Sequence, residues 1–147
     1  MADPNSVPCL ETTVLGPFTV PRVWTGLWQL SSPAWGTAPS GKIKREMARH
    51  VAEGYTAFGP QPLALVFDIL QADHYGSAEL LFGQFRQTLS DPSIVVGATK
   101  WCVFAPTVVT RAVVEEGVRE RMERMKYDKV DLLQVSEPCA SGQFFRA

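Results

Sequence analysis

Ile94-Val95-Val96-Gly97-Ala98-Thr99 and Val130-Asp131-Leu132-Leu133-Gln134-Val135 are two short apolar runs of the kind that form fully buried strands. Residues 107–125, which lie between them, carry a helical pattern. The positions of this helix predicted to face inward are Val114, Val118, Met122 and Met125. Because parallel strands need a crossover connection, the stretch predicts a parallel βαβ unit.

The same alternation recurs upstream. A strand candidate over 22–28 precedes a helix predicted from about Gly41 to Glu53, with Ser40 as its N-cap and Gly54 as its stop. A second strand begins at Tyr55-Thr56-Ala57-Phe58. The apolar stripe of the helix between them consists of Ile43, Met47 and Val51.

Ser77 is predicted to cap a further helix, which ends before Asp91-Pro92. The apolar face of that helix consists of Ala78, Leu81, Phe82, Phe85 and Leu89. A small hairpin over 12–20, with its turn at Gly16-Pro17, precedes all of these elements. The chain is therefore expected to be an α/β protein with about four parallel strands, three helices and an N-terminal hairpin.

The composition is that of an ordinary globular domain, with 147 residues, 46% apolar and 20% charged. A net charge of −1 gives no reason to expect nucleic acid or a membrane surface as a partner. Three scattered cysteines, no signal-like N-terminus and no long apolar run lead us to expect a cytoplasmic protein with free thiols. No spacing of histidines and cysteines suggests a metal site.

Three polar residues follow or end successive predicted strands: Tyr75, Lys100 and Ser136. Chemistry in α/β barrels takes place at the carboxyl ends of the strands, so these residues are expected at one rim. A nearby ammonium favours the phenolate and lowers the pKa of a tyrosine, which lets the phenol donate a proton to a carbonyl oxygen. Taken singly, without the surrounding motifs, Tyr75 is better explained as an aromatic filling a loop, and Lys100 as a solvent-facing residue at a strand end.

Several motifs occur in the order and spacing of one enzyme family. They are Gly26-Leu27-Trp28-Gln29-Leu30, Gly54-Tyr55-Thr56-Ala57-Phe58, Ala72-Asp73-His74-Tyr75-Gly76-Ser77-Ala78-Glu79, Thr99-Lys100-Trp101 and residues 126–134. Between Arg22 and Gln134 the chain resembles the NADP-dependent aldo-keto reductases. The resemblance implies a partial (β/α)8 TIM barrel and NADPH-dependent reduction of aldehydes or ketones. It also implies that Tyr75 is the proton donor, that Lys100 lowers its pKa, and that Gly26, Leu27 and Trp28 lie near the cofactor.

The chain departs from the family pattern in two site positions. An atypical insertion over 59–71 puts Leu70 where the family has an aspartate, five residues before Tyr75. Asp68 lies two residues too early, which displaces its carboxylate by about 6–7 Å along a strand. The family histidine falls at Ser136, and a hydroxyl cannot replace an imidazole that orients a carbonyl.

A third departure concerns length. A (β/α)8 barrel needs about 250 residues, so 147 residues supply about half of one, a single truncated domain with a divergent tail over 137–147. The phosphate-binding loops of such barrels follow strands seven and eight, which are absent here. We therefore expect weak or no catalysis. The alternatives are a non-catalytic fragment that acts by association or not at all, and an unrelated α/β domain.

An open sheet of four strands also has physical consequences. It leaves two unpaired edges and an inner face without an opposite wall. We expect such a chain to be molten, to aggregate, or to associate with itself through its open edges.

Overall fold

Four parallel strands form the centre of the protein in the computed structural model. They are β3 (Thr25–Gly26), β4 (Ala57–Gly59), β5 (Val96–Cys102) and β7 (Leu132–Ser136), and they lie side by side in the order of the sequence. The structure describes residues 10–31, 36–59, 76–102, 107–136 and 145–146. The predicted parallel α/β fold is confirmed.

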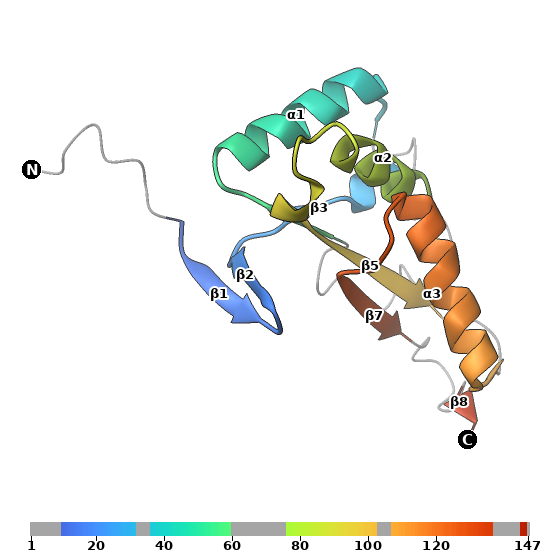
Figure 1. Cartoon of the computed structure of the whole chain (residues 1–147). Coiled ribbons are helices and arrows are strands. Elements are labelled where there is room, and N and C mark those ends of the chain that lie inside the picture. The colour runs from blue at the N-terminus through green and yellow to red at the C-terminus, as the bar shows by residue number, and fades with distance from the viewer. Residues whose placement is uncertain (1–9, 32–35, 60–75, 103–106, 137–144, 147) are drawn as a thin grey trace, which may run out of the picture.

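Three helices connect these strands. They are α1 (Ser40–Ala52), α2 (Gly76–Arg86) and α3 (Arg111–Met125), and Figure 1 shows them gathered along one side of the sheet. Two short 3-10 turns, η1 (Trp28–Ser31) and η4 (Pro92–Ile94), complete the connections. The opposite side, which would face the interior of a barrel, carries no described helix.

The predicted hairpin is present as β1 (Thr12–Leu15) and β2 (Phe18–Pro21), which pair antiparallel. Its turn is permitted by Gly16, whose φ of +58° is a conformation that L side chains rarely adopt. Val20 of β2 is fully buried against Ala57 and Val96. The hairpin therefore closes the sheet at the amino ends of β4 and β5, the end opposite the expected site. A smaller parallel pair joins β6 (Thr107–Val108) to β8 (Phe145–Arg146).

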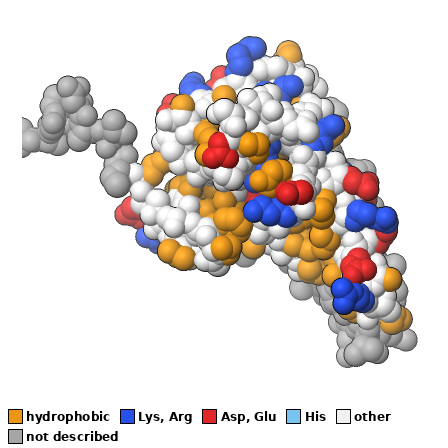
Figure 2. Space-filling model, in the orientation of Figure 1, with side chains coloured by type: hydrophobic (Ala, Val, Ile, Leu, Met, Phe, Trp, Pro, Cys, Tyr) orange, Lys and Arg blue, Asp and Glu red, His pale blue; other side chains and the backbone are white. Residues whose placement is uncertain are grey.

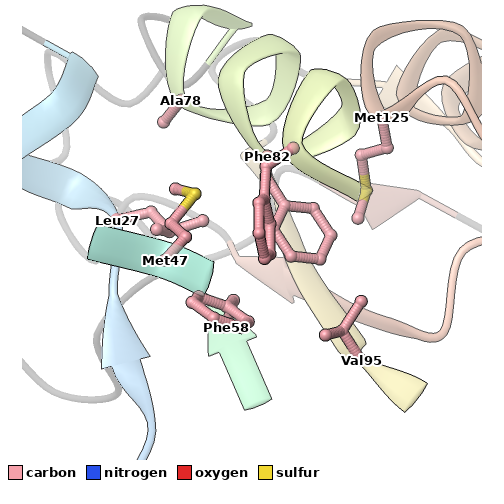
Figure 3. Close-up of a cluster of buried hydrophobic side chains, with 8 residues drawn as sticks. Leu27, Met47, Phe58, Ala78, Phe82, Val95 and Met125 are labelled. Atoms are coloured by element: carbon pink, nitrogen blue, oxygen red, sulfur yellow. The ribbon is translucent and has the colours of Figure 1, made fainter. Parts of the chain in front are cut away.

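The main core lies between the sheet and the helices. Figure 3 shows its side chains pointing toward one another. They come from Leu27, which directly precedes η1, from all three helices and from the sheet. The buried members are Leu27, Met47, Phe58, Ala78, Phe82, Phe85, Val95 and Met125. Ile43 and Val51 of α1 and Leu89 after α2 pack around it, so the apolar stripes predicted for these two helices are confirmed.

Several element boundaries differ from the prediction. The strand expected over 22–28 shrinks to Thr25–Gly26, because Leu27 turns into the core and Trp28 begins η1. Ser40 is the first residue of α1 rather than its cap, and Pro39 precedes it without a side-chain capping bond. Ser77 lies inside α2, where its hydroxyl donates a hydrogen bond to the carbonyl of Leu30 at 3.2 Å.

The inward face of α3 is rotated relative to the prediction. Val114 is 38% exposed, while Gly117, Arg121 and Met125 are buried. The ring of Trp101 explains the rotation, because a Cβ at Gly117 would lie only 3.1 Å from its atoms. Only glycine allows α3 to approach the indole this closely.

The exposed face of α3 is lined by ion pairs at helical spacing, and Figure 2 shows these charges spread along the helix. Arg111 pairs with Glu115 at 2.7 Å, as its spacing predicts, and Arg119 pairs with Glu116. Such solvated pairs contribute little individually. This face is an ordinary outer helix surface.

Candidate functional site

The direction of Lys100 follows from its neighbours on β5. The hydroxyl of Thr99 bonds to the carboxylate of Glu79 on α2, and Trp101 packs on α3. Both side chains therefore lie on the helix side of the sheet. Because successive strand residues alternate between faces, Lys100 lies on the inner face.

Lys100 lies near the carboxyl end of β5, half-buried, directly opposite Gln134 of β7. Two positions further along the strands, Cys102 and Ser136 are register partners. Among the residues that the structure describes, no carboxylate lies within ion-pair distance of the Lys100 ammonium. The inner rim thus presents a cation beside an amide, at the end of the sheet away from the hairpin.

Tyr75, the expected proton donor, lies outside the described residues, as do Asp68 and Leu70. Tyr75 immediately precedes α2, and the described helix begins at Gly76. The structure therefore places the lysine of the expected pair and leaves its partnership with Tyr75 a prediction.

The three residues expected near the cofactor occupy different environments. Gly26 pairs with Gly59 at the carboxyl ends of β3 and β4. Leu27 is 6% exposed, its N–H donates to the carbonyl of Gly59 at 3.0 Å, and its carbonyl accepts from Leu30 at 3.0 Å. The side chain and backbone of Leu27 are thus committed to the core and to the turn, and Trp28 starts that turn.

A small hollow of about 10 Å³ lies beside β5, which is room for about one water molecule. Its lining comprises Leu27, Ala78, Glu79, Phe82, Ala98, Thr99, Lys100 and Met125. Small-molecule sites usually measure about 300–1,000 Å³, so this hollow is a packing gap and not a ligand site.

The carboxylate of Glu79 is the buried polar group of this hollow. One oxygen accepts from Thr99, and the other lies 3.5 Å from the Arg124 guanidinium without a hydrogen bond. A buried carboxylate needs such partners, because an unpaired one is strongly disfavoured. Glu79 therefore ties α2 to β5 and to α3, and holds the strand that carries Lys100.

A second arrangement, which the sequence did not reveal, fixes β7 beside β5. Arg86 at the end of α2 pairs with Asp131 at 2.8 Å, and both side chains are almost fully buried. Asp131 also accepts the N–H of Gly97 at 2.9 Å, while Arg86 donates to the carbonyls of Pro92 and Val95. The sequence did contain a signal for this pair. Asp131 lies in a largely apolar predicted strand, and Arg86 lies near the end of a predicted helix with an apolar face.

A second hollow lies outside this rim. It measures about 240 Å³ and lies between β3, η1 and α1. Gly26 and Leu27 border it on the sheet side, while Lys42, Glu46 and His50 follow one another along α1. The imidazole Nδ1 of His50 is 2.7 Å from the Glu46 carbonyl, so this nitrogen is the donor.

Two further classes of site were searched. In the described ranges, no group of three histidine, cysteine or acidic residues is arranged to hold a metal ion. None of the described helices has the length and apolar character needed to cross a membrane.

Comparison with known proteins gives a structural likeness without a sequence relative. No protein-family model and no curated protein matches the chain. A solved structure similar to this one is that of the glycerol dehydrogenase AKR11B4 from Gluconobacter oxydans, an aldo-keto reductase, with a TM-score of 0.57 and 16% sequence identity. The match covers 88% of this chain and 39% of that one, so the chain spans about two fifths of the enzyme's length. At this identity the likeness shows a shared fold, part of a TIM barrel.

Proposed function

We propose that this chain is an oxidoreductase of aldo-keto reductase type, in which Tyr75 and Lys100 reduce aldehydes or ketones with NADP(H). The observation that carries the proposal is the position of Lys100 on the inner face, near the carboxyl end of β5. Active sites of barrels of this kind lie at that rim. The structural likeness to an aldo-keto reductase supports the same chemistry coarsely.

The proposed roles follow from the side chains. The Tyr75 hydroxyl would donate its proton to the carbonyl oxygen of the substrate, and the Lys100 ammonium would stabilise the phenolate that remains. Gln134, opposite Lys100, offers an amide that can hold a substrate oxygen. A bound reduced nicotinamide would supply the hydride to the carbonyl carbon.

The described residues fit the nicotinamide end of such a cofactor only in part. Gly26 borders the hollow between β3 and α1 without a side chain, whereas the space at Gly59 is filled by Ala98, 2.8 Å from a Cβ built there. Leu27, in contrast, is committed to the core. We therefore expect weak cofactor binding, made by backbone contacts near Gly26 rather than by the Leu27 side chain.

A second candidate is a protein without catalysis that acts by association. Ser136 favours this candidate, since it stands at the sequence position where the family resemblance implies a histidine. Leu70 in place of the family aspartate points the same way.

Fluorescence titration with NADPH, followed by turnover of a small aldehyde, separates the two. For the oxidoreductase we expect saturable binding, with turnover lowered about 100-fold or more in Tyr75→Phe and Lys100→Met, the range for loss of a general acid. Arg45→Met, which removes a cation at an exposed position of α1, is the control and should leave turnover unchanged. Absence of saturable NADPH binding by the folded chain rejects the oxidoreductase and leaves the second candidate.

A further inference from the structure

The sheet ends in two strands that each have one described neighbour. β3 pairs with β4 at one edge, and β7 pairs with β5 at the other, where Figure 1 shows it lying along the margin of the sheet. An edge strand carries a row of backbone N–H and C=O groups that can pair with a further strand. The edge of β7 runs over five residues, Leu132–Ser136.

We propose that two copies of this chain associate head to tail, with β7 of each copy beside β3 of the other, and close a ring of eight parallel strands. The two edges are complementary, because all four strands are parallel and follow the order of the sequence. A strand added beyond β7 therefore continues the direction of the sheet. Twice four strands gives eight, the number at which a closed barrel is filled by its own side chains.

Apolar surface flanks both edges. On the β7 side, Val135 is 50% exposed although it faces the helix layer, and Val114 on α3 is 38% exposed. On the β3 side, the half-buried side chains of Leu30 and Ile43 line a hollow of about 240 Å³ beside the strand. In the proposed ring both surfaces border the same contact, between β7 of one copy and β3 of the other. We call this contact the seam.

The seam also specifies the partner. Its two sides are different surfaces of one chain, so the contact is heterologous and a two-fold axis along the barrel repeats it. Each copy then uses both of its edges, and no edge remains. The inner faces meet in the closed ring, so the Lys100 residues of both copies would lie around one rim.

The experiment is sedimentation velocity of the purified chain over a concentration series, with three single variants. Val135→Asp places a charge on the β7 side of the seam, and Ala38→Trp, at an exposed residue, fills the hollow on the β3 side. Val14→Asp, 74% exposed on the hairpin, is the matched control. We expect a dimer of the 16.2 kDa chain. Each seam variant should weaken dimerisation at least tenfold, and the control should leave it unchanged.

Mixing the two seam variants tests the head-to-tail arrangement directly. A Val135→Asp copy retains an intact β3 side and an Ala38→Trp copy an intact β7 side, so the mixture should regain one seam and form a heterodimer. A mixture that stays monomeric shows that both copies use the same surface for the contact. This result overturns the head-to-tail arrangement. A folded monomer at every concentration, or open polymers without a dimer, also overturns it. None of these outcomes depends on NADPH, so they leave the proposed oxidoreductase activity to its own test.

Discussion

The guanidinium of Arg86 and the carboxylate of Asp131 meet at 2.8 Å, with 2% and 1% of their side chains exposed. Their hydrogen bonds hold β5 and the segment that leads into it. Asp131 accepts the N–H of Gly97 on β5, and Arg86 donates to the carbonyl of Val95 just before that strand. The ring of Tyr127 lies 3.6 Å from the guanidinium carbon and shields the pair from one side. This pair joins the end of α2 to both strands of the candidate site.

Breaking the pair from one side should destabilise the fold strongly. Asp131→Asn leaves the arginine charge uncompensated in the interior, and we expect a loss of about 3–5 kcal/mol in the free energy of unfolding. Urea denaturation followed by circular dichroism, at fixed protein concentration, measures it. The double variant Arg86→Met/Asp131→Leu should lose less than Asp131→Asn, because no buried charge remains.

The exposed pair of Arg111 and Glu115 is the control for this measurement. Its atoms are 2.7 Å apart, as close as those of the buried pair, but 91% and 62% of the side chains are exposed. Arg111→Gln should therefore change stability by about 0–1 kcal/mol. Equal losses at the buried and the exposed pair would contradict the assigned role of Arg86.

Gly83 on α2 should not tolerate alanine. A Cβ there would lie 2.5 Å from the backbone carbonyl atoms of Met125, which cannot move aside as a side chain can. We expect Gly83→Ala to lower stability by about 1–3 kcal/mol, although alanine favours a helix by about 1 kcal/mol. Gly41→Ala is the matched helical control, since its Cβ would meet only Arg45, at 3.8 Å. It should be neutral or stabilising, and a loss of similar size in both variants would refute the packing argument.

Asp91 should titrate at an unusually acidic pH. The hydroxyl of Ser93 lowers the pKa of this carboxyl most, and the backbone N–H of Ser93 lowers it further. Because the folded-state pKa is depressed, the stabilisation is present above the ordinary pKa and is lost as the pH falls through the lowered value. Carboxyl carbon NMR of Ser93→Ala should show the pKa of Asp91 rising toward its ordinary range. Ser93→Thr, which keeps a hydroxyl, should leave it low.

The regular parts of the fold were predictable because they depend on periodicity. The stripe of Ile43, Met47 and Val51, and the apolar run at 94–99, each specify an element without help from the rest of the chain. The inward face predicted for α3 was right at Met125 and wrong at Val114, because Trp101, which precedes the helix, selects Gly117 as the point of contact. The motif did not reveal that the Leu27 side chain lies in the core, and its nearness to a cofactor stays a prediction. Tertiary packing decided the orientation of α3 and the burial of Leu27. A local sequence pattern carries no information about such packing.

The inner rim allows a test by gain of function at Ser136. This residue is the register partner of Cys102, two positions beyond Gln134, which is the register partner of Lys100. Ser136→His would put an imidazole where the proposed function needs a group that orients the substrate carbonyl. Since a positioned acid or base contributes typically 10²–10⁴-fold, we expect NADPH-dependent aldehyde turnover to rise about tenfold or more.

Two controls distinguish catalysis from a general effect of Ser136→His. Adding Lys100→Met to Ser136→His should abolish the gain, because the proton donor then lacks its ammonium partner. Ser136→Gln supplies a polar side chain of similar reach without an imidazole, and should give no gain. A gain in turnover that remains after Lys100→Met is added would show that turnover does not depend on the inner rim. It would refute the assignment of Lys100, even if the chain binds NADPH.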